Sequence, residues 1–462
     1  MKDKIGYTLG DLGCCCTEQF RAMYLAIFYT LVLKVNPVHV GILMLITKLW
    51  DAINDPLIGA LVDSHQNKGK GKFIPWIKFF AFPTAVLCIL GFVNVSNFAY
   101  GARLAYMFIT YVVYEIMYTC VSVPFGSLSS VMTDDVNQRT DLSRFRSLGG
   151  TIFMTVIVIA GPLFLYKDNQ PVPSHFLIMA AICAVIGFIC LMFTSHWCKE
   201  RIITEPVAKE KEKLNYLDVL KAISKNKALL GVMLSSFIGI VGAGMVNGLN
   251  TYLFRDYFGN VAIMAVSGML SVIWSLIAFI GTKFVAKKFG KKEWIMYSAT
   301  FSVVVYAILF FFPLENPLLF IIINGICYLG VSGFQVLVWA LVNDAIDYQE
   351  LQTGKRNEGI VYSAYTFFRK LANAVSGSMS SFALAIAGFQ VNEAVQNEAF
   401  SGRLWKTYTG LYVVGYLLAV LVLKFIYPLT KEKTAEMLQN LSDKRNAANA
   451  ESVSYTHLTL PT

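Results

Sequence analysis

The sequence predicts an all-α integral membrane protein with about twelve transmembrane helices arranged in two six-helix halves. The chain of 462 residues is 56% hydrophobic and only 15% charged. Its apolar runs reach about 20 residues, the length at which a helix spans a bilayer. The longest polar segment, residues 199–227, separates six apolar runs from six others.

Each apolar run is assigned one span, because a helix satisfies all its backbone hydrogen bonds inside the bilayer. We expect the spans near residues 10–33, 38–62, 74–95, 102–126, 147–166, 174–195, 228–253, 262–285, 294–312, 317–342, 358–388 and 405–428.

The same runs divide the chain into regions. We expect an N-terminal half at 1–198, a cytoplasmic linker at 199–227, a C-terminal half at 228–430 and a cytoplasmic tail at 431–462. Composition changes abruptly at 451–462, so we suspect that this stretch is not native. The N-terminus lacks the apolar core and cleavage site of a signal peptide, and the first span should direct insertion.

Lysine and arginine gather in alternate loops, at 68–72, 139–146, 199–227, 287–292 and 355–356, and at both ends of the chain. Because cytoplasmic loops retain positive charge, both termini should be cytoplasmic. The net charge of +10 is mainly this topology signal, so we expect no nucleic-acid partner. A basic inner face can also contact anionic lipid.

The halves echo each other six spans apart. The fourth span runs into VMTDDVNQRTDLSRFRS, and the tenth runs into LVNDAIDYQELQTGKRNEG. Such a pattern indicates a parallel repeat of the kind found in transporters. The alternative is that every inner loop is basic and some matches arise by chance.

The stretch KLWDAINDPLIG places two acids inside the second span. Asp51 and Asp55 lie one turn apart on the same helix face, and Asn54 lies close to it. Two such carboxylates repel each other unless one is protonated or a cation sits between them. Oxygen ligands suit Na⁺, and Pro56 can free backbone carbonyls as further ligands. The alternative is an ion pair with Lys48 or Lys370.

KLWDAINDPLIG, with GALVDS after it, resembles the glycoside-pentoside-hexuronide:cation symporter family of the major facilitator superfamily. The resemblance extends over most of the chain through YTLGDLG, YTCVSVPFGSL at 118–128, MTDDVNQRTDLSRFR at 132–146, NDAIDYQE at 343–350 and EGIVYSAYTFFRK at 358–370. It implies a major facilitator fold in the bacterial cytoplasmic membrane and cation-coupled symport of a glycoside, pentoside or hexuronide. It also implies a monomer with Na⁺ or H⁺ as coupling ion and no other cofactor.

The resemblance implies roles for individual residues. The cation site is carried over to Asp51, Asn54, Asp55 and Thr119. The substrate site is carried over to Tyr118, Ser122, Arg144, Gln335, Thr366 and Lys370, of which Lys370 would compete with the cation for the acids.

The departures from the pattern concern the sugar. Where melibiose permeases place sugar-gripping acids on the first and fourth helices, this chain has Cys15 and Ser122. Arg21, a cation in the first span, has two interpretations that the sequence leaves open. It holds the carboxylate of a uronic acid as part of the substrate site, or it pairs with Glu18 or Glu115.

A set of inner-loop charges is interpreted as gates that pair across the halves when the protein faces outward: Asp63, Asp134, Arg139, Asp344 and Arg356. Two rival functions stay open, a carrier of an amphipathic or lipid-like solute and a non-transporting membrane sensor. The chain has no H-E-x-x-H, G-x-S-x-G or phosphate-binding glycine loop, so we expect no enzyme.

Overall fold

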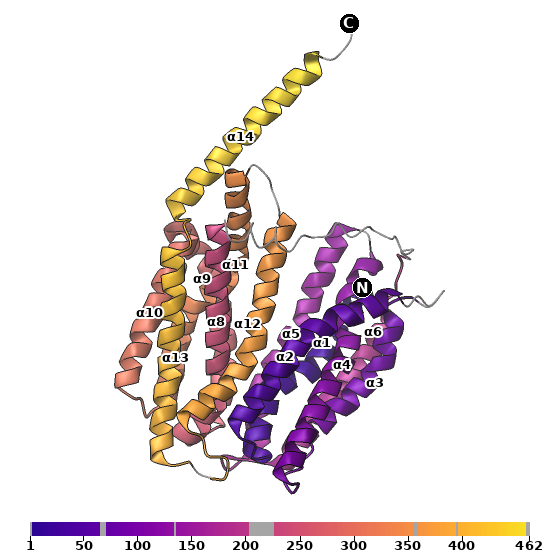
Figure 1. Cartoon of the computed structure of the whole chain (residues 1–462), viewed down its shortest axis with the longest axis vertical. Helices are drawn as coiled ribbons and strands as arrows, with labels where there is room; N and C mark the ends of the chain where they lie inside the picture. The colour runs from indigo at the N-terminus through magenta and orange to yellow at the C-terminus, as the bar shows by residue number, and fades with distance from the viewer. Residues whose placement is uncertain are drawn as a thin grey trace.

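The structure is a computed structural model that describes residues 2–64, 71–133, 135–202, 226–353, 358–393 and 396–458. In these ranges the first half contains α1 (Lys2–Ile27), α2 (Pro37–Ser64), α3 (Ile74–Leu90), α4 (Tyr100–Met132), α5 (Val136–Leu165) and α6 (Pro173–Trp197). The second half contains α8 (Lys227–Tyr252), α9 (Ile263–Phe289), α10 (Lys291–Phe311), α11 (Pro317–Thr353), α12 (Glu358–Ala387) and α13 (Glu398–Phe425). Figure 1 shows the two halves side by side.

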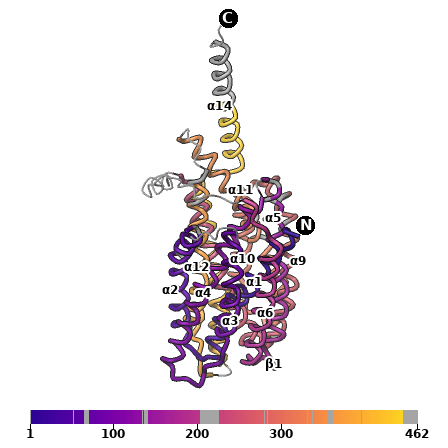
Figure 2. Tube along the Cα trace, turned by 90° about the vertical axis from the view of Figure 1, so that its right-hand side faces the viewer, coloured from indigo at the N-terminus to yellow at the C-terminus, as the bar shows by residue number. Residues whose placement is uncertain are grey.

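Four short elements and a terminal helix complete the described chain. Two π-helices, η1 (Phe28–Val32) and η2 (Leu253–Tyr257), continue the first helix of each half. Strands β1 (Tyr166–Lys167) and β2 (Gln170–Pro171) form an antiparallel hairpin whose turn is residues 168–169. Helix α14 (Lys431–Leu458) points away from the bundle at the end opposite β1 (Figure 2).

The helices begin where the sequence carries start signals. Pro37, Pro173 and Pro317 open α2, α6 and α11, and proline suits this position because its missing N–H is not needed there. The Asn226 side chain caps α8 by accepting the N–H of Leu229 at 2.9 Å. These local signals fix the ends of helices whose middles are set by the apolar runs.

The predicted spans match the helices, although several helices run further than the apolar runs. Eight helices in the described ranges are long and apolar enough to cross a membrane by composition alone. Of the others, α3 has only 17 residues. Helices α1, α2 and α12 carry charged side chains in mid-helix, which makes them less apolar.

The pattern of helix packing in the first half recurs in the second half, six spanning helices further along the chain. In the first half α1 packs against α5 and α6, α3 against α4 and α6, and α2 against α4. In the second half α8 packs against α12 and α13, α10 against α11 and α13, and α9 against α11. Each pair of one half therefore has its equivalent in the other, as expected for a parallel repeat.

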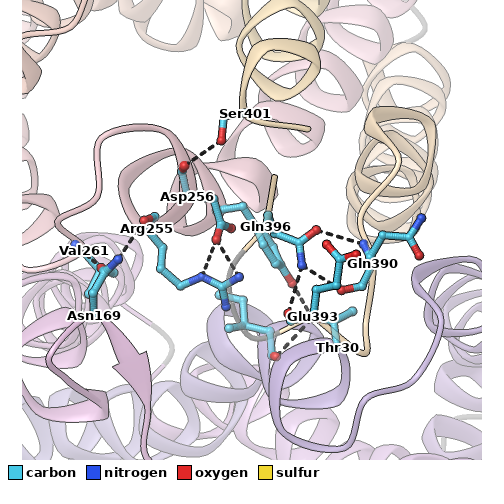
Figure 3. Close-up of polar contacts among 11 residues, drawn as sticks. Thr30, Asn169, Arg255, Asp256, Val261, Gln390, Glu393, Gln396 and Ser401 are labelled. Atoms are coloured by element: carbon cyan, nitrogen blue, oxygen red, sulfur yellow. Dashed lines mark hydrogen bonds and ion pairs between the residues drawn. The ribbon is translucent and has the colours of Figure 1, made fainter. Parts of the chain in front are cut away.

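The halves meet through α2 with α12 and through α5 with α9. At the end where η1 and η2 lie, Thr30 and Tyr252 share a hydrogen bond between their hydroxyls. Asn169 of the hairpin turn donates to the backbone oxygen of Arg255 at 2.8 Å and accepts from the N–H of Val261 at 2.9 Å (Figure 3). We call these contacts among Thr30, Asn169, Tyr252, Arg255 and Val261 the closed-end contact.

The buried apolar core agrees with closure at this end only. The largest cluster contains residues of both halves, among them Phe28, Tyr166, Tyr252 and Trp405. At the other end the core is two separate clusters, one in each half. The halves diverge toward the end on which the N-terminus lies (Figure 1).

Glycines bring α1 and α5 into backbone contact. A Cβ on Gly149 would lie 2.4 Å from the Thr8 oxygen and 2.7 Å from the Leu12 nitrogen. Asp11 of the YTLGDLG motif accepts the N–H of Gly150 at 2.9 Å and the Arg146 Nε at 3.0 Å. This motif therefore ties the two helices together at the N-terminal end.

Glu200, just after α6, fixes the start of α3. Its carboxylate accepts the backbone N–H groups of Lys72, Phe73 and Ile74 at 2.6, 2.8 and 2.7 Å. These are donors that a helix start leaves unpaired, and a carboxylate there also complements the helix dipole.

Candidate functional site

A cavity of about 730 Å³ lies between the halves and is lined by residues of both. Its size is that of a pocket for a small molecule. The first half contributes four charged residues to its wall, namely Glu18, Arg21, Lys48 and Glu115. The second half contributes only uncharged residues, many of them Asn, Ser and Gly.

Lys48 is the centre of the charged wall. Its Nζ lies 3.0 Å from Asp51, 3.5 Å from Glu115 and 3.6 Å from Glu18. Three carboxylates from α1, α2 and α4 thus surround one ammonium group. The Oδ1 of Asp51 and the Oε2 of Glu18 are buried and have no hydrogen-bond partner among the described residues. Buried acceptors of this kind suit a further cation or proton.

Asp51, Asn54 and Asp55 lie on α2 as the sequence predicted. The Thr119 hydroxyl on α4 donates to the Oδ1 of Asp55 at 3.3 Å, so these two members of the expected cation site are in contact. Asn54 is buried. Among the described residues no group of three or more His, Cys, Asp or Glu side chains could hold a metal ion.

Lys48, and not Lys370, is the lysine next to the acids in this structure. Lys370 is exposed on α12, and within the described ranges no ion pair involves it. The spacing of three residues between Lys48 and Asp51 was a signal for their pairing, since such neighbours meet on a helix. The competition with a cation that the resemblance assigned to Lys370 is therefore available to Lys48.

Arg21 is 3% exposed and lies in the cavity wall. Its guanidinium carbon is 3.3 Å from the centre of the Tyr114 ring and 4.7 Å from that of Tyr111, which are cation–π contacts. Its Nη1 is 3.8 Å from the Oε1 of Glu115, an ion pair without a hydrogen bond. The pairing with Glu115 that the sequence left open thus occurs, but it is loose.

The uncharged wall contains three asparagines from two helices of the second half. Asn247, Asn250 and Asn324 all line the cavity. Asn250 accepts from the Tyr408 hydroxyl at 2.8 Å, and Asn324 accepts from the Tyr306 hydroxyl. Interhelical hydrogen bonds therefore orient two of the amides that face the cavity.

Further polar residues of this wall were not predicted from the sequence: Ser267, Ser271, Trp274, Asn373, Ser376, Ser380 and Ser381. The indole Nε1 of Trp274 is buried without a hydrogen-bond partner in the described part of the chain. Serines are too common in helices to be singled out by spacing, so no sequence signal could have found them.

Other residues assigned to the substrate lie outside this cavity's lining: Tyr118, Ser122, Arg144, Gln335, Thr366 and Lys370. Tyr118 stacks on Tyr114 with ring centres 5.8 Å apart. The Thr366 hydroxyl donates to the Tyr362 oxygen of its own helix at 2.8 Å. The Arg144 side chain is 78% exposed and lies 3.9 Å from Asp141. Of the predicted substrate residues, only Arg21 lines the cavity.

The proposed gates are partly outside the described residues. Asp134 and Arg356 fall in the gaps of the described ranges, and only the backbone is described at Asp63 and Arg139. Asp344 is buried, and both its oxygens accept from Lys291 at 2.7 Å. Asp344 is therefore paired within its own half here.

A sequence model of the family described as "MFS/sugar transport protein" matches residues 6–431. The chain belongs to this family. Among known proteins it is 32% identical to the uncharacterized symporter YjmB of Bacillus subtilis, over 96% of each chain. It is 27% identical to a putative sulfoquinovose importer of Escherichia coli, over 96% of this chain and 94% of that one. It is 28% identical to an isoprimeverose transporter of Lactiplantibacillus pentosus, over 97% and 92%.

A solved structure shares the fold. A bacterial homolog of the human lysosomal transporter Spinster, inward-facing and unoccupied, superposes with a TM-score of 0.66 over 95% of this chain and 96% of that one, at 12% identity. The predicted fold and family are thus confirmed. The protein is a multi-pass membrane transporter of the sugar-transport type and not an enzyme.

Proposed function

We propose that this transporter couples the inward movement of a monovalent cation, Na⁺ or H⁺, to the uptake of a sugar-like solute. The observation that carries the proposal is the cluster of Glu18, Asp51 and Glu115 around Lys48, of which Glu18, Lys48 and Glu115 line the cavity. Three buried or half-buried acids sharing one ammonium are stable only if their excess charge is compensated.

Lys48 supplies the coupling. Its ammonium occupies the place beside Asp51 that a cation would take, so a cation that binds there must displace it. The freed ammonium then becomes available at the cavity wall, where a solute hydroxyl or acidic group can accept its hydrogen bonds. Binding of each ligand thus favours binding of the other, and linkage makes the effect reciprocal.

The uncharged wall supports a sugar-like solute. Asparagine amides, serine hydroxyls and the free Trp274 N–H offer donors and acceptors to a hydroxyl-rich molecule. Relatives named for sugar uptake, the putative sulfoquinovose importer and the isoprimeverose transporter, support the same class. A lipid-like solute would give no acceptor to the buried Trp274 N–H, at a cost of about 1–3 kcal/mol.

Purified protein in vesicles tests the proposal. Addition of a transported sugar should drive cation entry, measured with ²²Na⁺ or a pH dye. Asp55→Asn should abolish the dependence of sugar uptake on the cation. Asp168→Asn is the matched control, because Asp168 is exposed in the hairpin turn with φ 49, a conformation that Asn tolerates. Sugar uptake indifferent to cations in the unmutated protein would refute the coupling.

A further inference from the structure

We propose that Trp274 and Gly325 set the upper size limit of the solute. Because Gly325 has no side chain, the Trp274 indole can lie against α11, and the cavity keeps room for a solute of two sugar rings. The inference rests on the proposed function and names the size of solute within it.

The indole of Trp274 lies directly on the backbone of Gly325. Both residues line the cavity, Trp274 from α9 and Gly325 from α11. A Cβ added at Gly325 would lie 2.1 Å from the indole Nε1, 2.3 Å from its Cε2 and 2.7 Å from its Cδ1. Ordinary contacts between such atoms are about 3.5–4.0 Å. The indole can therefore occupy this place only if residue 325 has no side chain.

A glycine at this position needs a reason. Glycine is disfavoured inside a helix because it loses more backbone freedom on folding than other residues. Gly325 nevertheless lies within α11 and is buried, although it belongs to the cavity wall. The close approach of the indole is the reason that the structure offers.

The cavity is the free side of the indole. Helix α9 packs against α11, and α10, which contributes no residue to the cavity wall, packs against both. Ser275, next to Trp274, shares a hydrogen bond with the Tyr328 hydroxyl of α11 at 3.3 Å, so the two helices are held together beside the indole. A methyl group at residue 325 would push the indole from 2.1 Å to about 3.5 Å, a movement of about 1.4 Å into the cavity.

Such a movement would exclude large solutes first. Small-molecule pockets are about 300–1,000 Å³, and this cavity of about 730 Å³ is in the upper part of that range. Ser271 lines the wall one helical turn before Trp274, on the side of Val261 and the closed-end contact. A molecule that enters from the open end therefore passes the indole before it reaches Ser271.

Thiol labelling at Ser271→Cys tests the size limit without a solute. The background is Cys15→Ser, because the other eight cysteines are buried. The probes are 2-aminoethyl methanethiosulfonate, which is small, and its biotin-bearing derivative, which is large. We expect Gly325→Ala to slow the large reagent at least tenfold and the small reagent less than twofold. Gly377→Ala is the matched control, since Gly377 also lines the cavity but an added Cβ there meets nothing within 4 Å.

A second variant separates the position of the indole from a general disturbance of the fold. Trp274→Leu in the Gly325→Ala background should restore the rate of the large reagent. An unchanged rate in Gly325→Ala, an equal loss in Gly377→Ala, or no recovery in the double variant would each overturn the size limit. Should Gly325→Ala fail to fold, Trp274→Leu alone serves, with the large reagent expected to react at least threefold faster.

Uptake into vesicles extends the test to solutes. The probes are the disaccharide isoprimeverose and the single-ring methyl α-D-xyloside. We expect Gly325→Ala to reduce uptake of the disaccharide at least tenfold more than uptake of the xyloside, and equal losses would contradict the size limit. Uptake of neither probe by the unmutated protein would count against the proposed sugar function, while the labelling rates would still decide the size limit.

Discussion

Replacing Lys48 by Met should tighten the binding of the coupling cation at least tenfold. The ammonium of Lys48 lies 3.0–3.6 Å from three carboxylates, and the side chain is only 27% exposed. Two unit charges 4 Å apart attract each other by about 4 kcal/mol at an effective dielectric constant of about 20. A cation binding beside Asp51 must overcome part of this attraction to displace the lysine. Even a third of one such term, about 1.4 kcal/mol, corresponds to a tenfold change in affinity.

The assay is equilibrium binding of ²²Na⁺ together with a pH titration of solute affinity, on protein that elutes as a single species. Lys370→Met is the matched control, since Lys370 is exposed and makes no ion pair within the described ranges. It should leave cation affinity within about twofold. Unchanged cation affinity in Lys48→Met, or a larger effect in Lys370→Met, would show that Lys48 is not the competitor.

Three further predictions concern packing and the closed end. Gly149→Ala should lower the free energy of unfolding by about 1–3 kcal/mol, because the added Cβ would meet backbone atoms of α1. At Gly126 an added Cβ meets nothing within 4 Å, so Gly126→Ala should leave stability unchanged or raise it. Thermal unfolding of both variants measures the difference. Asn169→Gly suits the local φ of 62 but removes two hydrogen bonds between the halves of about 1 kcal/mol each. Hydrogen exchange at residues 253–261 should then rise about tenfold, and unchanged exchange would contradict this role. Glu200→Ala should lower the free energy of unfolding by about 1–2 kcal/mol, because it removes three hydrogen bonds at the start of α3. Lys199→Ala, a change at the exposed neighbouring residue, should leave stability unchanged.

The fold was predictable because its signals are local. A run of about 20 apolar residues has few alternatives to a spanning helix. The ends were less predictable, as α11 shows by continuing to Thr353, well beyond the span expected to end near 342. Past that point the helix is held by packing against α14, where Met437 and Leu441 are buried. Such support is tertiary and leaves no mark on hydropathy.

The candidate site was predictable where it lies on one helix. The positions of Asp51, Asn54 and Asp55 follow from spacing, and so does the approach of Lys48 to Asp51. What the sequence could not decide is which residues of different helices meet. Lys370 matched a family position near the acids, yet it is exposed on α12, a helix of the other half. The serine and asparagine wall likewise becomes visible only when four helices, α8, α9, α11 and α12, are brought together.

The separation of charge between the walls of the cavity has a consequence for how the two halves move and how such a protein can change. All four charged residues of the wall belong to one half. When the halves rock about a bound solute, the second half exchanges only uncharged hydrogen bonds, so no ion pair must be broken and desolvated at the moving interface. The two halves can also diverge in sequence independently. Substitutions in the first would alter which ions and acidic groups are accepted, and substitutions in the second would alter which arrangement of hydroxyls fits.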